Sequence, residues 1–473
     1  MTCVTRCLEA LEKPTSMIMN SPTIDLYTKL YEVSELATKR LSFRLEGHVT
    51  RIVGLTIEVV GIKAAVGEKC LIGNGNNRLD AEVVGFSGKY TYLMPGKDIR
   101  GITPGEKVVS TGTVYTARVG YSLLGRVIDS SGEPIDHGGP LASLHEIPLT
   151  ARPVNPYFRE PIRQPLDVGV RAINALLPIG RGQRIGLFAG SGVGKSVLLG
   201  MMTKYTEADV IVYGTIGERG REVREFVENI LGEEGMSKAV VIAAPADTSP
   251  MQRLHGAMLA TSIAEYFRDQ NKNVLLLMDS LTRFAQAQRE VALAVGEPPA
   301  TKGYPPSVFA KIPQLVERSG NGVRGQGSIT AIYTVLMEGD DQQDPVADAA
   351  RAILDGHFVL SRELSDKGHY PAIDIEASVS RVIENISRPA QLSNIKLFRE
   401  YYSAYMKNKD MIEVGAYDPG SNEVIDKAIE FYPKFTAFLR QTVDQQIHHE
   451  QAINELHQLI SRITEKSHEE SPT

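Results

Sequence analysis

The sequence predicts an α/β core with a parallel sheet, preceded by an all-β barrel and followed by a helical domain. Three observations support this fold class. Short strands with glycine turns fill residues 46–112, apolar strands alternate with helical segments over 113–385, and helical spacing follows residue 386. Closely spaced short strands are typical of small barrels, and alternating strands and helices are typical of parallel sheets. With 473 residues, the chain is long enough for several domains.

Residues 1–45 are expected to form an N-terminal helical segment that binds a partner. Ser21 followed by proline is a typical helix start. The apolar residues that share one face of this helix are Ile24, Tyr27, Leu30 and Tyr31. A frayed terminus without a partner is the alternative interpretation.

The other three stretches have clearer patterns. The barrel domain, residues 46–112, has expected strands at 48–54, 55–61, 80–85 and 90–96. The core domain, residues 113–385, has expected strands at 185–189, 210–216, 239–243, 274–278 and 328–336. These core runs are apolar throughout, as in strands that are buried on both faces. Residues 386–473 are expected to be helical to the end, with a core stripe of Val443, Ile447, Ile453, Leu456, Ile460 and Ile463.

Composition excludes several classes of protein. The net charge is −6, which argues against nucleic acid as the main partner. Three cysteines exclude a disulfide framework. No apolar run reaches the roughly 18 residues that a membrane-spanning helix needs, and the N-terminus lacks the apolar core of a signal peptide. We therefore expect a cytoplasmic protein.

A phosphate-binding loop lies at residues 189–196, with the sequence Ala-Gly-Ser-Gly-Val-Gly-Lys-Ser. It follows an apolar strand and opens an apolar helix, so its backbone N–H groups and the helix dipole can surround a phosphate. Lys195 is expected to reach the β- and γ-phosphates, and the Ser196 hydroxyl to hold Mg²⁺. The expected nucleotide-binding residues here are Ala189, Gly190, Ser191, Gly192, Val193, Gly194, Lys195, Ser196 and Val197.

Two acidic residues follow other core strands. Asp279 ends the strand at 274–278, which is where a second Mg²⁺-handling group is expected. Glu218 follows the strand at 210–216 and is placed to deprotonate an attacking water. Glu222 is the alternative candidate for this role. A solvated charge cluster, Glu-Arg-Gly-Arg-Glu, is the interpretation without catalysis.

The chain contains three further motifs: Gly-Glu-Arg-Gly-Arg-Glu-Val at residues 217–223, Met-Asp-Ser-Leu-Thr-Arg at 278–283, and Gly-Glu-Pro-Pro-Ala-Thr-Lys-Gly-Tyr-Pro-Pro-Ser at 296–307. These motifs resemble those of the type III export ATPases, which are relatives of the catalytic subunit of rotary ATP synthases. The stretches 368–381 and 414–417 are more similar to the flagellar branch than to the virulence branch. Gly220 and Ser196 argue against a rotary synthase subunit, where threonine is usual at both positions. The carboxylate of Glu218 argues against a non-catalytic subunit.

The resemblance implies a P-loop ATPase that forms a homohexamer with ATP sites between protomers. It implies that Lys195 and Glu218 are catalytic, that Ser196 and Asp279 lie in the Mg²⁺ shell, and that Arg219 contributes to nucleotide binding. Arg381, in Ser-Val-Ser-Arg, would reach into the neighbouring protomer's site. Tyr370 would pack on adenine, although a core tyrosine before proline remains the alternative.

The resemblance also implies partners and a location. The N-terminal helices would bind a dimeric regulatory subunit, and a central stalk protein would occupy the ring centre. The C-terminal domain would face the export gate and receive chaperone–substrate complexes. The protein would act in the cytoplasm, peripherally at the export apparatus of the inner membrane. A virulence secretion ATPase and, less favoured, a rotary synthase subunit remain alternatives, and a nucleic-acid translocase is not expected.

Overall fold

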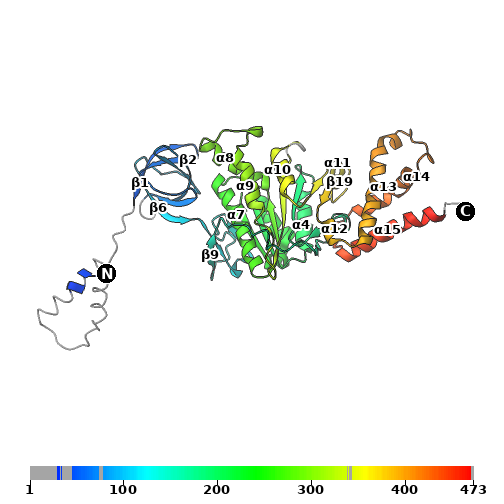
Figure 1. The fold of residues 1–473 in the computed structure, drawn as a ribbon, viewed down its shortest axis with the longest axis horizontal. Helices are drawn as coiled ribbons and strands as arrows, with labels where there is room; N and C mark the ends of the chain where they lie inside the picture. Colours follow the sequence, from blue (N-terminus) through cyan, green and yellow to red (C-terminus); the bar gives the residue numbers. More distant parts are fainter. Residues whose placement is uncertain are drawn as a thin grey trace, which may run out of the picture. The chain divides into compact units, whose positions relative to one another are not determined.

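The computed structural model describes residues 29–31, 33–34, 45–73, 78–97, 99–337, 339 and 344–469. The chain divides into two units, Met1–Leu45 and Glu46–Thr473 (Figure 1). The helix start predicted at Ser21 lies outside the described residues. Residues 29–31 and 33–34 are helical, and the side chains of Leu30 and Tyr31 are more than half exposed.

The second unit begins with a closed six-stranded barrel (Figure 1). Its strands are β1 (Glu46–Val53), β2 (Thr56–Val60), β3 (Glu68–Ile72), β4 (Leu79–Ser87), β5 (Tyr90–Pro95) and β6 (Lys107–Val114). They pair in the order β1-β2-β5-β4-β3-β6. Side chains alternate in and out, so Ile57, Val59, Val83 and Leu93 fill the interior. The sequence predicted β1, β2, β4 and β5 but missed β3 and β6, whose short runs mix charged and apolar residues.

A largely parallel sheet forms the core of the nucleotide-binding region. Its strands are β8 (Arg126–Asp129), β12 (Arg184–Ala189), β13 (Val210–Ile216), β14 (Ala239–Ala244), β15 (Asn273–Asp279), β16 (Gly320–Asn321), β17 (Ser328–Leu336), β18 (Gly356–Leu360) and β19 (Ile373–Ser380). The order is β19-β18-β12-β17-β15-β13-β14-β8, and β16 pairs with β17. Only β19 and β16 run antiparallel to their neighbours. Two small antiparallel pairs accompany the sheet, β7 (Thr116–Val119) with β9 (His145–Pro148) and β10 (Pro165–Leu166) with β11 (Ile179–Gly180).

Helices cover both faces of this sheet (Figure 1). The α-helices are α3 (Arg171–Leu176), α4 (Lys195–Tyr205), α5 (Gly220–Glu225), α6 (Gly232–Ser237), α7 (Pro250–Asp269), α8 (Leu281–Ala294), α9 (Pro306–Val316), α10 (Pro345–Ile353), α11 (Arg362–Asp366) and α12 (Ile383–Ile386). Residues Tyr121–Leu123 and Thr301–Gly303 form 3₁₀ turns, and Phe226–Leu231 form a π-helix. Neighbouring strand residues face opposite sides, so Phe188 packs with α7–α10 while Leu187 packs with α3 and α4.

Three helices follow the sheet: α13 (Pro389–Glu413), α14 (Glu423–Leu439) and α15 (His449–Glu469). Leu456, Ile460 and Ile463 are buried, as predicted. The expectation of helix to the end was wrong at residues 414–422 and 440–448, which are turns and extended chain. Val443 lies in the second of these and is half exposed. Ile447 lies in the same segment and is buried as predicted, although it precedes α15. Together, barrel, sheet and helices confirm the predicted fold class.

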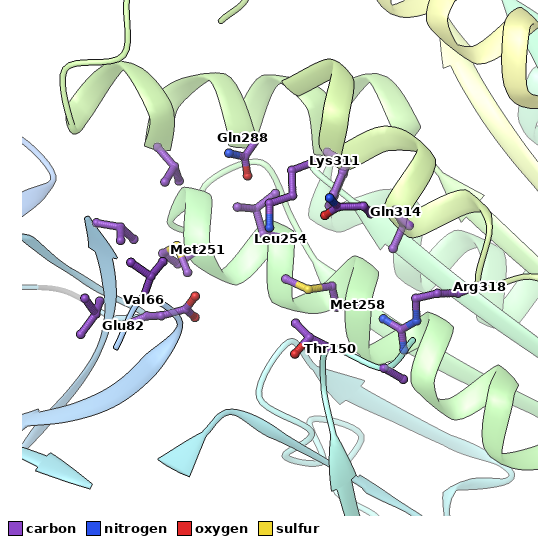
Figure 2. Close-up of a pocket in the computed structure, with 16 residues that line it drawn as sticks. Val66, Glu82, Thr150, Met251, Leu254, Met258, Gln288, Lys311, Gln314 and Arg318 are labelled. Atoms are coloured by element: carbon purple, nitrogen blue, oxygen red, sulfur yellow. The ribbon is translucent and has the colours of Figure 1, made fainter. Parts of the chain in front are cut away.

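Helix α7 holds the barrel against the nucleotide-binding region. The His255 imidazole Nε2 lies 2.7 Å from a carboxylate oxygen of Glu82 on β4, and the Ser249 hydroxyl donates to the Gly96 carbonyl at 3.1 Å. A cavity of 220 Å³ remains between them (Figure 2). Its labelled lining is Val66, Glu82, Thr150, Met251, Leu254, Met258, Gln288, Lys311, Gln314 and Arg318. No helix in the described ranges is both long and apolar enough to cross a membrane.

Candidate active site

The predicted phosphate loop lies at the carboxyl edge of the sheet. It connects β12 to α4, and Lys195 is the first residue of that helix. Gly192 and Gly194 have φ angles of 79° and 91°, a conformation that suits glycine. The absence of a side chain and the positive φ angles of these glycines let the loop turn so that its backbone N–H groups can face a phosphate. Val193 points the other way, and its side chain is buried in the core.

Asp279 is the buried acid of this edge. Only 2% of its surface is exposed at the end of β15. One carboxylate oxygen contacts the Lys195 ammonium and accepts a 2.5 Å hydrogen bond from the Thr334 hydroxyl. The other accepts a 3.5 Å hydrogen bond from the Tyr213 hydroxyl. A buried carboxylate is tolerated because these partners replace water.

Glu218 lies next to this pair but has a different environment. Its side chain is 13% exposed, and its Oε1 lies 3.8 Å from the Lys195 ammonium. That oxygen is buried and has no hydrogen-bond partner among the described residues. Burial raises the pKa of Glu218, the Lys195 charge opposes this shift, and the charges of Asp279 and Glu222 add to it. A carboxylate with a raised pKa and an oxygen that no hydrogen bond occupies is suited to accept a proton.

The phosphate loop and Glu218 border a pocket of 660 Å³. Glycines of the loop, Lys195, Ser196 and Val197 form one wall, while Glu218, Arg219 and Glu222 form another. Asp279 does not line this pocket. It lies behind Lys195, with its carboxylate turned to the lysine.

Two further arginines line the pocket and were not predicted from the sequence. Arg283, on the first turn of α8, donates to the Gln286 side chain at 2.7 Å, and its β-carbon packs against Gly217. Arg362, at the start of α11, donates to the Ser191 carbonyl at 3.1 Å. Arg283 ends the Met-Asp-Ser-Leu-Thr-Arg motif, so its place one turn after Asp279 was a usable signal. Arg362 lies 171 residues from Ser191, and no local pattern indicates it.

Tyr370 lies beside the loop rather than in the core. Its ring approaches Gly194 so closely that a β-carbon there would lie 3.3 Å from it. The side chain is 44% exposed, and its hydroxyl pairs with that of Ser365 at 2.9 Å. It borders a second hollow of 590 Å³, which shares Val197 with the first pocket. This arrangement favours the ring-packing role over a core tyrosine.

Arg381 is not brought to this pocket. It follows β19, which runs antiparallel to β18, so Ser380 pairs with Gly356 at the amino edge of the sheet. Its guanidinium is exposed and donates to the Arg351 carbonyl at 3.0 Å. The adjoining strand β12 has six residues, about 17 Å at the rise of a strand residue. This length separates the two edges, and Arg381 does not line the pocket of its own chain.

The donor set fits Mg²⁺ bound together with a nucleotide. Mg²⁺ prefers oxygen ligands and is usually held by one or two protein groups plus substrate phosphates and water. Ser196 offers an exposed hydroxyl at the pocket wall, and Asp279 offers a carboxylate behind it. Within the described ranges, no cluster of three or more His, Cys, Asp or Glu side chains could hold a metal unaided. These residues therefore suit a metal that arrives with phosphate.

Comparison with known proteins identifies the family. The models of the ATP synthase alpha/beta family match at residues 49–112 for the beta-barrel domain and 169–380 for the nucleotide-binding domain. The T3SS EscN ATPase C-terminal domain matches at residues 387–458. The "Flagellum-specific ATP synthase" of Pseudomonas aeruginosa is 57% identical over 85% of this chain and 90% of its own. The protein of the same name in Salmonella typhimurium is 54% identical over 87% of this chain and 93% of its own.

The chain belongs to the ATP synthase alpha/beta family, among the flagellum-specific ATPases. This confirms the resemblance predicted from the sequence. Solved structures agree with the assignment. The assembled EscN ATPase of the enteropathogenic E. coli type III secretion system has a TM-score of 0.84 at 42% identity, covering 88% of this chain and all of its own. EscN in complex with its central stalk EscO has a TM-score of 0.80 at 41% identity, with the same coverage.

The raised pKa of Glu218 predicts the pH dependence of ATP hydrolysis. A base must be ionised to act, so kcat/KM should fall as pH drops through a pKa above the ordinary glutamate value of 4.5. Glu222→Gln removes a negative charge that raises this pKa, so the acidic limb should move to lower pH. The wild type and the Glu222→Gln variant hydrolyse the same substrate, so protonation of ATP itself affects both pH profiles equally. An acidic limb at the same pH in both proteins would contradict this assignment of the base.

Proposed function

We propose that this chain hydrolyses Mg-ATP to energise the type III protein export apparatus of the bacterial flagellum. The observation that carries the proposal is the position of the Glu218 carboxylate. Its buried Oε1 has no hydrogen-bond partner among the described residues and lies 3.8 Å from the ammonium group of Lys195. The family supplies the context, since relatives at 57% and 54% identity over most of their length are named flagellum-specific ATP synthases.

The residues of one chain perform the first part of the reaction. The loop N–H groups and Lys195 bind the phosphates, and the Ser196 and Asp279 oxygens would hold the Mg²⁺. When bound, Mg²⁺ neutralises charge on the phosphate oxygens. Glu218 accepts the proton of the water whose oxygen attacks the γ-phosphorus, while the bond from that phosphorus to the leaving ADP oxygen breaks. Arg219, Arg283 and Arg362 line the pocket where this charge develops.

Arg381 completes the site from a neighbouring copy. Its position at the amino edge, away from its own pocket, leaves another chain's pocket as its target. A guanidinium there can stabilise the charge on the transferring phosphoryl group. A homohexameric ring provides such an interface for every site, and the related EscN ATPase has been solved in an assembled state. Tyr370 of the same chain as the loop packs on adenine.

We propose the remaining partners from the family resemblance. A central stalk protein occupies the ring; the related EscN ATPase has been solved in complex with its central stalk EscO. The N-terminal segment, residues 1–45, binds a dimeric regulatory subunit that brings the ATPase from the cytoplasm to the export gate at the inner membrane. The C-terminal helical domain receives chaperone–substrate complexes, which are unloaded and unfolded for export.

A virulence-associated secretion ATPase is the second candidate. EscN favours it as a structural neighbour, at 42% identity. The flagellar relatives from Pseudomonas aeruginosa and Salmonella typhimurium are more similar in sequence, at 57% and 54%. This difference favours the flagellar role, with the same enzyme chemistry in either case.

Glu218→Gln tests the catalytic base. The substitution keeps size and polarity but removes the proton acceptor, so turnover should fall about 10²-fold or more while binding of Mg-ATP is retained. Lys195→Ala is the control, because it should lose much of the binding as well. Steady-state hydrolysis and equilibrium binding of a fluorescent ATP analogue separate the two effects. Normal turnover in Glu218→Gln would transfer the role to Glu222.

Arg381→Ala tests the shared site. The variant should bind nucleotide normally yet lose about 10³-fold in turnover. Mixed with Lys195→Ala protein, it should regain partial activity, because some interfaces then combine an intact loop with an intact arginine. Hexamer formation is checked by sedimentation in each mixture. If assembled mixtures never recover activity, Arg381 does not act across the interface.

Deletion in the host cell tests the biological role. Cells without the chain should lack filaments but retain any host-directed secretion. Deleting only residues 1–20 should preserve nucleotide binding while reducing motility, because recruitment rather than catalysis is lost. Filament staining, motility in soft agar and assays of secreted effectors distinguish the outcomes. A knockout that swims normally but fails to inject effectors would replace the flagellar role with the virulence role.

A further inference from the structure

Two neighbouring aromatic side chains protrude from the turn at residues 156–158. Tyr157 is 88% exposed, the highest value for a large hydrophobic side chain in the described part of the chain, and Phe158 is 59% exposed. Their rings meet edge to face, with centroids 5.3 Å apart. Single exposed apolar residues are common on protein surfaces, but a preformed aromatic pair in water is a costly surface.

The turn is held in place on both sides. Asn155 accepts backbone hydrogen bonds from Tyr157, at its side-chain oxygen, and from Phe158, at its carbonyl, both at 3.0 Å. Arg159 then inserts its guanidinium and donates to the Ser319 and Glu317 carbonyls at 2.6 and 2.7 Å. These contacts hold the backbone of the turn in place before any partner arrives, which lowers the entropy cost of binding this segment.

Arg159 fits a space that only glycine leaves open. Gly320 has a φ of 119°, and a β-carbon on it would lie 2.4 Å from the Arg159 guanidinium. Gly320 pairs with Ile329 at the amino end of β17. The aromatic pair is therefore anchored at the amino edge of the sheet.

A short chain of polar contacts links this anchor to Arg381. The Glu317 carboxylate pairs with the Arg184 guanidinium at 2.6 Å, and Arg184 pairs with Asp355 at 2.9 Å. The Asp355 carbonyl accepts the backbone N–H of Arg381 at 3.0 Å. The aromatic pair and Arg381 thus flank the same ion-pair cluster at one edge of the sheet.

We propose that Tyr157 and Phe158 form an aromatic contact with a second copy of this chain, at the interface that also carries Arg381. The inference rests on the proposed function, which places Arg381 between protomers. Continuity with that interface identifies the occupant as another copy rather than a different protein. Exposed tyrosine and phenylalanine are typical of interface centres, where truncating them weakens binding strongly.

The double variant Tyr157→Ser/Phe158→Ser tests the contact. Sedimentation and hydrolysis per protomer are measured over a range of protein concentrations, and ATP analogue binding is measured on the dilute protein. The variant should need at least about tenfold more protein for half-maximal assembly, with nucleotide binding unchanged. Val414→Ser, which removes a 78% exposed apolar side chain after α13, should assemble like the wild type.

A second measurement does not depend on the folding of that variant. A benzophenone amino acid replaces Tyr157, and copies with two different tags are mixed, irradiated and purified on both tags. Covalent pairs of the two tagged chains support the contact.

Two results would overturn this inference alone: the double variant assembles at the concentrations at which the wild type does, or assembled protein gives no crosslinked pairs. The aromatic pair would then bind a partner outside the ring. A wild-type chain that never assembles overturns the proposed function together with it.

Discussion

The parallel sheet keeps the residues at its carboxyl edge one strand length away from those at its amino edge. The arrangement of the candidate site depends on this separation. Strands β12, β13 and β15 run parallel in register, so the phosphate loop, Glu218 and Asp279 meet where these strands end. Strand β19 runs against β18 and delivers Arg381 to the other edge. The phosphate loop and Arg381 therefore lie on opposite edges of the sheet, and the proposed function joins them through a second copy.

The two carboxylates at the carboxyl edge are adapted to different tasks by their surroundings. Asp279 accepts a hydrogen bond from Thr334 and contacts the Lys195 ammonium, so its charge is balanced and its position is fixed. Glu218 shares the same lysine at a longer distance and keeps one buried oxygen without a hydrogen bond. A fixed anion suits a metal shell, whereas a desolvated and less restrained carboxylate suits proton transfer. Local packing thus supports the roles that we propose for Asp279 and Glu218.

The sequence predicted the features that depend on local pattern. Largely apolar runs located β13 and β17 to the residue, and the acidic residues that end or follow such strands are Glu218 and Asp279. Strand β3 escaped because charged and apolar residues mix within five positions. The sequence did not predict the non-helical segment around Val443, because the spacing of its apolar residues happens to match that of a helix.

Features that depend on distant parts of the chain could not be predicted from pattern. Arg362 meets the loop only because α11 follows β18 at the same edge, and Thr334 meets Asp279 only because β15 and β17 are neighbours. The position of Arg381 at the opposite edge required the direction of β19, which no local spacing reveals. The resemblance named Arg381 as a residue acting between protomers, and this role remains a proposal with which its position at the amino edge is consistent.

The most direct test is a structure of the assembled protein with Mg²⁺ and a slowly hydrolysed ATP analogue. We expect Lys195 of one copy and Arg381 of the adjacent copy both to contact the γ-phosphate, with Glu218 facing the position of the attacking water. A γ-phosphate surrounded only by residues of its own chain, with Arg381 of every copy turned away, would contradict the claim that the site is completed between copies.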